Sequence, residues 1–113
     1  MKIIAHKISI AELNKMAEQM FGDLIKAVVD TEKKIMAIDA ELHSDEEALL
    51  IEAGSQQNDL WGINLYPELD SEDWIEFDSV INIRPSQGNR SRGVDSPEKR
   101  KAIVEIVNSL VER

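Results

Sequence analysis

Apolar residues along this chain of 113 residues follow two periods, and their order predicts the order of the secondary-structure elements. Spacings of three and four residues are typical of helices, whereas alternation and short apolar runs are typical of strands. The predicted strands cover residues 2–8, 24–30, 35–40, 60–66 and 74–84. The predicted helices begin at Ser9, Ser44 and Ser96.

Each predicted helix has a recognisable first turn. Ser9 and Ser44 are each followed three residues later by a glutamate, the pattern of a capping box. Ser96 precedes Pro97, and proline is favoured at the first helical position. We therefore expect serine side chains to cap all three helices.

The order strand, helix, hairpin, helix, hairpin, helix predicts an α+β protein with the element order βαββαββα. We expect a mostly antiparallel sheet of about five strands, covered mainly on one face by three helices. The segment 60–66 alternates in the manner of a half-buried strand. The first six elements match a split β-α-β motif, which favours a ferredoxin-like core. At this length we expect residues 1–113 to form a single globular domain.

The net charge of −9 is unevenly distributed along the chain. Residues 35–83 contain no lysine or arginine, whereas residues 84–101 carry six basic and two acidic residues. An acidic chain is repelled by phosphate backbones, so we expect no general nucleic-acid binding. A small anionic ligand remains compatible with the basic segment.

The loop 84–93 contains the most distinctive group of polar residues. Arginine forks suit carboxylate or phosphate groups, and glycines allow backbone amides to turn toward an anion. We expect an anionic small molecule to bind here through Arg84, Arg90, Arg92, Asn82, Asn89, Asn64 and Ser86. A second hypothesis is an interaction protein, either a homodimer or a partner-binding protein, whose arginine loop pairs with an acidic surface.

His43 is the only plausible proton carrier, and it lies among Glu41, Asp45, Glu46 and Glu47. A metal-dependent hydrolase centred on His43 is therefore a third hypothesis. The spacing matches no zinc-peptidase or calcium-loop pattern, so we assign no metal ligands and expect no cofactor. Whether the protein is an enzyme stays open at this point.

The chain contains no cysteine and no apolar run long enough to span a membrane. It also lacks the long apolar core of a signal peptide near residue 1. We expect a cytoplasmic protein that does not bind membranes.

Three phrases, at residues 41–50, 60–67 and 81–93, resemble a small prokaryotic family of unknown function. The resemblance covers nearly the whole chain, and the third phrase is the most specific. It implies a stand-alone bacterial or archaeal protein, and it implies no activity, cofactor or catalytic residue.

Overall fold

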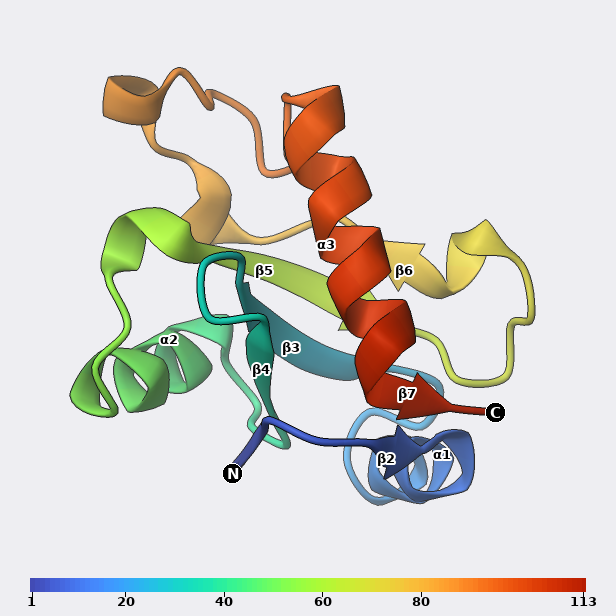
Figure 1. Ribbon diagram of the computed structural model, residues 1–113. Coiled ribbons are helices and arrows are strands. Elements are labelled where there is room, and N and C mark those ends of the chain that lie inside the picture. The colour runs from blue at the N-terminus through green and yellow to red at the C-terminus, as the bar shows by residue number, and fades with distance from the viewer.

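The computed structural model describes residues 1–113 as a five-stranded sheet, three α-helices and a separate pair of short strands (Figure 1). The sheet follows the order β1-β4-β3-β5-β6, and every neighbouring pair is antiparallel. Its strands are β1 (Lys2–Ile4), β3 (Ile25–Asp30), β4 (Ile35–Ile38), β5 (Leu60–Leu65) and β6 (Ile75–Glu76). The helices are α1 (Ile10–Gln19), α2 (His43–Glu52) and α3 (Pro97–Leu110). The predicted α+β class is confirmed.

The sheet contains two interlocked β-α-β units. β1 and β3 run parallel with β4 between them, and β4 and β5 run parallel with β3 between them. The first unit is the split β-α-β motif expected from the sequence. A ferredoxin-like sheet would place the fourth strand beside the first, whereas here that strand, β5, lies beside β3. The strand order therefore departs from the ferredoxin-like core that the sequence favours.

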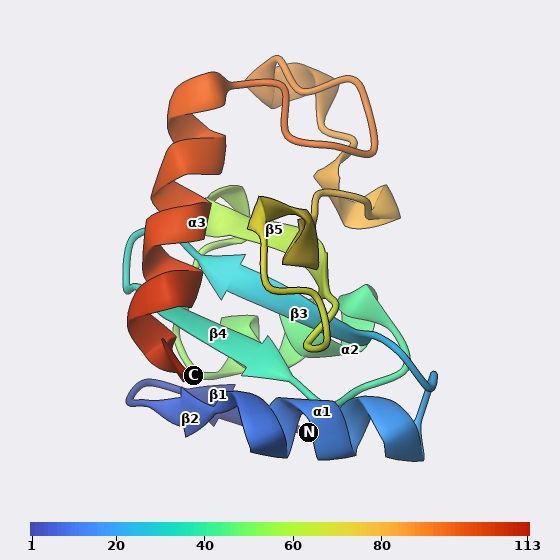
Figure 2. The ribbon, with the colours of Figure 1, turned by 90° about the vertical axis from the view of Figure 1, so that its right-hand side faces the viewer.

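The same two units place helices on both faces of the sheet. In both units the chain crosses the sheet in the same direction, from β1 to β3 and from β4 to β5. The strands β1 and β3 point opposite to β4 and β5. Because such crossover connections are right-handed, the helices α1 and α2 of the two units lie on opposite faces. α1 and α3 share one face and α2 covers the other (Figure 2), so two of the three helices lie on one face, in agreement with the expectation.

The two faces carry cores of different size. The face under α1 and α3 packs into a cluster of 20 buried apolar residues, which includes Leu13, Trp61 and Ile103. The cluster on the face under α2 contains only four buried apolar residues, Val28, Ala37, Leu50 and Leu60. Since stabilisation grows with the apolar area removed from water, the first face dominates the stability of the fold. The second face has room for polar groups.

β5 lies between β3 and β6, and all six of its residues are buried. The prediction of a half-buried strand is therefore wrong, although the predicted boundaries are close. One face of β5 meets the large core, and α2 and the loop after β6 cover the other.

The predicted strand 74–84 is much shorter in the structure. β6 pairs only with Asn64 and Leu65, and the chain then forms short 3-10 turns over Val80–Asn82 and Pro85–Gln87. The hydroxyl of Ser79 accepts a hydrogen bond from the backbone N–H of Ile81 at 3.2 Å. Such local bonds compete with strand pairing, so the apolar alternation does not extend the sheet.

Two of the three expected helix caps are present. The hydroxyls of Ser9 and Ser96 accept hydrogen bonds from the backbone N–H groups of Glu12 and Lys99, at 3.1 and 3.2 Å. The expected cap at Ser44 is wrong, because α2 begins at His43, two residues earlier than a cap at Ser44 requires. Leu42 occupies the N-cap position and offers no hydrogen bond from its side chain. The first turn of α2 therefore has backbone N–H groups with no side-chain acceptor.

A short parallel pair joins the segment before α1 to the segment after α3. β2 (Ile8–Ser9) pairs with β7 (Val111–Glu112), directly before α1 and directly after α3 (Figure 1). This pair ties the two helices of the larger core to each other. None of the helices combines the length and apolar character that a membrane crossing requires.

Candidate functional site

The loop 78–95 is attached to the sheet by Asn82, whose side chain is fully buried. Its Oδ1 accepts from the backbone N–H of Gly62 at 2.8 Å, and its Nδ2 donates to the Gly62 carbonyl at 3.0 Å. Nδ2 also donates to the carbonyl of Arg92 at 2.9 Å. The amide of Asn82 thus completes the hydrogen bonding of β5 where no strand lies beside it.

Asn89 organises the interior of the same loop. Its Nδ2 donates to the carbonyls of Asn82 and Gly93, both at 2.8 Å, and its Oδ1 accepts from the N–H of Asp95 at 2.7 Å. Both asparagines predicted to orient a ligand in this loop are therefore occupied by backbone groups. They shape the loop instead of facing an open space.

Arg84 points back into the protein. Its Nε donates to the Ile81 carbonyl at 3.0 Å, and Nη1 donates to Gln57 and Gln87 oxygens at 2.9 and 3.0 Å. Nη2 donates to the Leu60 carbonyl. Burial lowers the pKa of Arg84 from its ordinary value, and a nearby glutamate, Glu47, opposes this effect. Every nitrogen of the guanidinium group already has a protein acceptor.

The plane of the Arg84 guanidinium also stacks on an aromatic ring. Its central carbon lies 4.6 Å from the centre of the Trp61 ring, and the Lys99 ammonium lies 5.8 Å from the same ring. Cations over the face of a tryptophan are attracted by the ring electrons. Arg84 therefore joins the loop to Trp61 of β5, and Lys99 of α3 lies over the same ring.

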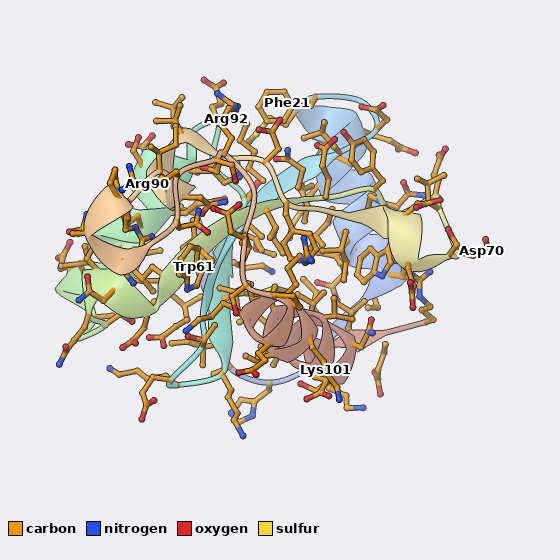
Figure 3. All side chains as sticks on the ribbon, turned by 90° about the horizontal axis from the view of Figure 1, so that it is seen from above. Phe21, Trp61, Asp70, Arg90, Arg92 and Lys101 are labelled. Carbon is orange, nitrogen blue, oxygen red and sulfur yellow. The ribbon has the colours of Figure 1, made fainter.

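The other members of the predicted loop site are spread apart. Ser86 and Arg90 are exposed, and the backbone N–H of Arg90 donates to Asp95 at 3.0 Å. Arg92 lies on the side of the molecule that carries Phe21, whereas Arg90 lies at one end (Figure 3). The Nε of Arg92 pairs with Asp78 at 2.6 Å. The three arginines thus do not converge on one point.

A pocket of about 240 Å³ lies between the start of α2 and this loop, and we call it the α2 pocket. Its basic groups, Lys26 and Arg92, come from β3 and from the loop. Lys26 forms no ion pair, and its ammonium lies 5.5 Å from the centre of the Phe21 ring. The lining residues are Lys26, Leu42, His43, Ser44, Ser79, Val80, Ile81 and Arg92.

His43 is buried beside β5 and contributes to the wall of the α2 pocket. Its Nε2 lies 2.7 Å from the carbonyl oxygen of Ile63. Because a carbonyl only accepts, Nε2 carries the ring proton and Nδ1 is left as an acceptor with no partner in the chain. Burial lowers the pKa of His43, and the nearby cations Lys26 and Arg92 lower it further. The imidazole is therefore neutral at pH 7.

The acidic residues around His43 in the sequence separate in the structure. Glu41 and Asp45 are exposed, whereas His43 and Glu46 point toward the sheet. No three histidine or carboxylate side chains approach one another closely enough to hold a metal ion.

Glu46 is fully buried under α2, and neither carboxyl oxygen accepts a well-formed hydrogen bond. Burial raises the pKa of Glu46 to about 9, and the backbone of Ala40 and the charge of Lys26 offset part of this rise. The carboxyl group is therefore protonated and neutral at pH 7. It adds no negative charge behind the α2 pocket.

Asn64 belongs to a polar row that runs across three strands. It lies opposite Lys26 on β3 and Glu76 on β6, and its Nδ2 donates to the Glu76 carboxylate at 2.8 Å. Its Oδ1 is buried without a partner. Of the residues predicted to bind a ligand, Asn64 is the one with a buried polar atom that lacks a partner.

The sequence alone does not identify Ser79, which lines the α2 pocket, or its close neighbour Gly62 in β5. A Cβ atom on Gly62 would lie 2.5 Å from the Ser79 Cβ and 3.2 Å from the His43 ring. Glycine at this position therefore lets the serine and the histidine meet over β5. A glycine inside an alternating strand is the signal that marks such a close approach.

The fold and the site define a small α+β protein with helices on both faces of its sheet and a basic pocket at one helix N-terminus. A family described as "Protein of unknown function (DUF5674)" matches residues 2–110, so the chain belongs to this family. No curated protein and no solved structure matches the chain. The predicted resemblance to a family of unknown function over nearly the whole chain is confirmed.

Proposed function

We propose that this protein binds a small anionic molecule in the α2 pocket. The observation that carries the proposal is the convergence of Lys26 and Arg92 on the uncapped N-terminus of α2. These groups come from three separate segments of the chain. All three favour negative charge, and no carboxylate lines the pocket with them.

The N-terminus of α2 would supply backbone donors for the anion. Leu42 leaves the first N–H groups of the helix without a side-chain acceptor. A helix N-terminus carries a partial positive charge of about half an elementary charge, and its N–H groups bind phosphate and carboxylate well. Leu42 and Ser44 line the pocket, so these donors lie at its edge.

The two basic side chains would supply charge. Lys26 has no ion-pair partner, and Arg92 pairs with Asp78 through Nε alone. An exposed pair of this kind is worth about 0–1 kcal/mol, so an anion can share the guanidinium without a large loss. His43 would add a neutral acceptor, Nδ1, for a hydroxyl or protonated acid on the ligand.

The proposal moves the anion away from the centre of the loop 84–93. Of the three arginines in that loop, only Arg92 lines the α2 pocket. Arg84, Asn82 and Asn89 hold the loop in place and so build the pocket wall. The interaction protein is the second candidate function, although Arg84 and Arg92 lie beside Glu47 and Asp78 of their own chain.

The proposal is tested with inorganic phosphate, sulfate, acetate and simple phosphate monoesters in a thermal-shift assay, followed by calorimetry. A ligand at about 100 times its Kd stabilises the folded state by about 2.7 kcal/mol, which raises Tm by several degrees. Lys26→Met and Arg92→Gln should each remove most of this shift. Arg90→Gln is the matched control, because it removes the same charge from the same loop outside the pocket.

Two outcomes would contradict the proposal. One is the absence of any shift with every anion in the panel. The other is a shift that Arg90→Gln reduces as much as Arg92→Gln, since the anion would then respond only to net charge.

A further inference from the structure

Apolar side chains also line the α2 pocket beside its basic groups, and we call these apolar side chains the rim. Three of the eight lining residues are hydrophobic, namely Leu42, Val80 and Ile81. Leu42 and Val80 are 53% and 63% exposed. These large apolar side chains come from two segments, the start of α2 and the turn after β6, and they meet at one opening.

The folding of the chain does not account for Leu42. It occupies the N-cap position of α2, where serine, threonine, asparagine and aspartate are strongly preferred. A leucine side chain cannot accept the capping hydrogen bond. It is also little buried here, because it stays in contact with solvent. A residue that breaks a local rule without a compensating gain marks a position where a functional explanation is needed.

Val80 raises the same question from the other side of the pocket. Its turn is held by Ser79, whose hydroxyl accepts from Ile81, and by Asn82, which bonds to β5. Neither contact involves the Val80 side chain, so the turn forms without it. Apolar groups that gather on a rim are typical of a ligand or partner surface.

We infer that the ligand of the α2 pocket is a small amphipathic anion. Its carboxylate or phosphate monoester group meets Lys26 and Arg92, and its short aliphatic or aromatic part covers Leu42 and Val80. This inference rests on the proposed function and names the class of ligand. The pocket volume of about 240 Å³ lies below the range of drug-sized sites, so the apolar part is a short chain or a single ring.

The inference is tested with linear carboxylates from acetate to octanoate and with alkyl phosphates of matched chain length. Binding is followed by NMR titration of labelled protein, because this method measures weak affinities. Each buried methylene should tighten binding about fourfold until the rim is covered, after which affinity levels off. An affinity that does not change with chain length would overturn the inference.

Variants separate the two parts of the ligand. Leu42→Ala and Val80→Ala should flatten the dependence of affinity on chain length, so that each variant loses much more affinity for octanoate than for acetate. Lys26→Met should weaken every member of the series by a similar factor. Leu69→Ala is the matched control, because Leu69 is an exposed leucine outside the pocket. The Tm of each variant without ligand shows that it is folded.

The outcomes distinguish this inference from the proposed function. If no anion binds in a manner sensitive to Lys26 and Arg92, the proposed function fails. If anions bind but Leu42→Ala and Val80→Ala leave the dependence on chain length intact, only the inference fails. If light scattering shows a dimer that these two variants dissociate, the rim is a contact between copies of the chain and the inference is overturned.

Discussion

The side-chain amide of Asn82 pairs with both backbone groups of Gly62, as a neighbouring strand would. It accepts from the Gly62 N–H at 2.8 Å and donates to the Gly62 carbonyl at 3.0 Å. β6 pairs with β5 only at Asn64 and Leu65, so the edge of β5 at Gly62 has no strand beside it. One side chain thus replaces a missing strand and sets the position of the loop that forms the α2 pocket.

Asn82→Ala should destabilise the protein by about 2–6 kcal/mol. The substitution leaves the N–H and the carbonyl of Gly62 buried without partners, and each such group costs about 1–3 kcal/mol. Urea unfolding of wild type and variant measures the difference. Asn108→Ala removes an exposed asparagine amide and should change stability by less than about 0.5 kcal/mol. Equal effects of the two substitutions would contradict a structural role for Asn82.

Gly62→Ala should destabilise the protein by about 1–3 kcal/mol, the usual cost of overpacking a core. The new Cβ would lie 2.5 Å from the Cβ of Ser79, so the loop must shift. Because the closest contact is with this side chain, Ser79→Gly in the same protein should recover part of the loss, which a double-mutant cycle measures. Gly93→Ala is the control, since its nearest neighbour would lie 3.4 Å away. Additive effects of the Gly62 and Ser79 substitutions would show that their contact is not the cause.

Glu46 should make the stability of the protein fall with rising pH. Burial raises its pKa in the folded state to about 9, from an ordinary value of 4.5. Between these two values the unfolded state has lost the proton and the folded state still holds it. The unfolded state then binds fewer protons, so the free energy of unfolding decreases with pH across this window. The limiting slope is about 1.4 kcal/mol per pH unit.

Glu46→Gln should remove this dependence, because glutamine keeps the shape of the protonated carboxyl and does not titrate. Urea unfolding at pH 5, 7 and 9 compares the two proteins. The variant should gain stability relative to wild type as pH rises. Parallel pH profiles for the two proteins would show that the Glu46 carboxyl is already ionised in the folded state.

Arg84→Lys should cost about 1.5–3 kcal/mol, the range for hydrogen bonds made by a charged group. Lysine cannot reproduce the planar fork, so carbonyls of Ile81, Gln57 and Leu60 lose their donor. The fluorescence of Trp61 should also change, because the guanidinium lies 4.6 Å from its ring. Arg90→Lys is exposed and should alter neither property. A lysine variant with wild-type stability would contradict the structural role of Arg84.

Part of the candidate site could be predicted from residue types alone. The arginines and glycines of the loop 84–93 predict a binding site there, and this loop contributes Arg92 to the lining of the α2 pocket. The roles of Asn82, Asn89 and Arg84 could not be read in the same way. A polar side chain looks alike in a sequence whether it bonds to a ligand or to a carbonyl of its own chain. Lys26 interrupts an otherwise apolar run in the sequence, but no local pattern connects it with Arg92.

The sequence by itself determined the local elements of this protein. The strands at 25–30, 35–38 and 60–65 and the helices that begin after Ser9 and Ser96 follow from periods and caps that span a few residues. The tertiary structure alone decided the strand order, the face that α2 covers and the partners of Arg84. These features depend on contacts between residues far apart in the chain, such as Arg84 and Gln57, which are separated by 27 positions. No local pattern encodes such a contact, because its energy arises only when the whole sheet has formed.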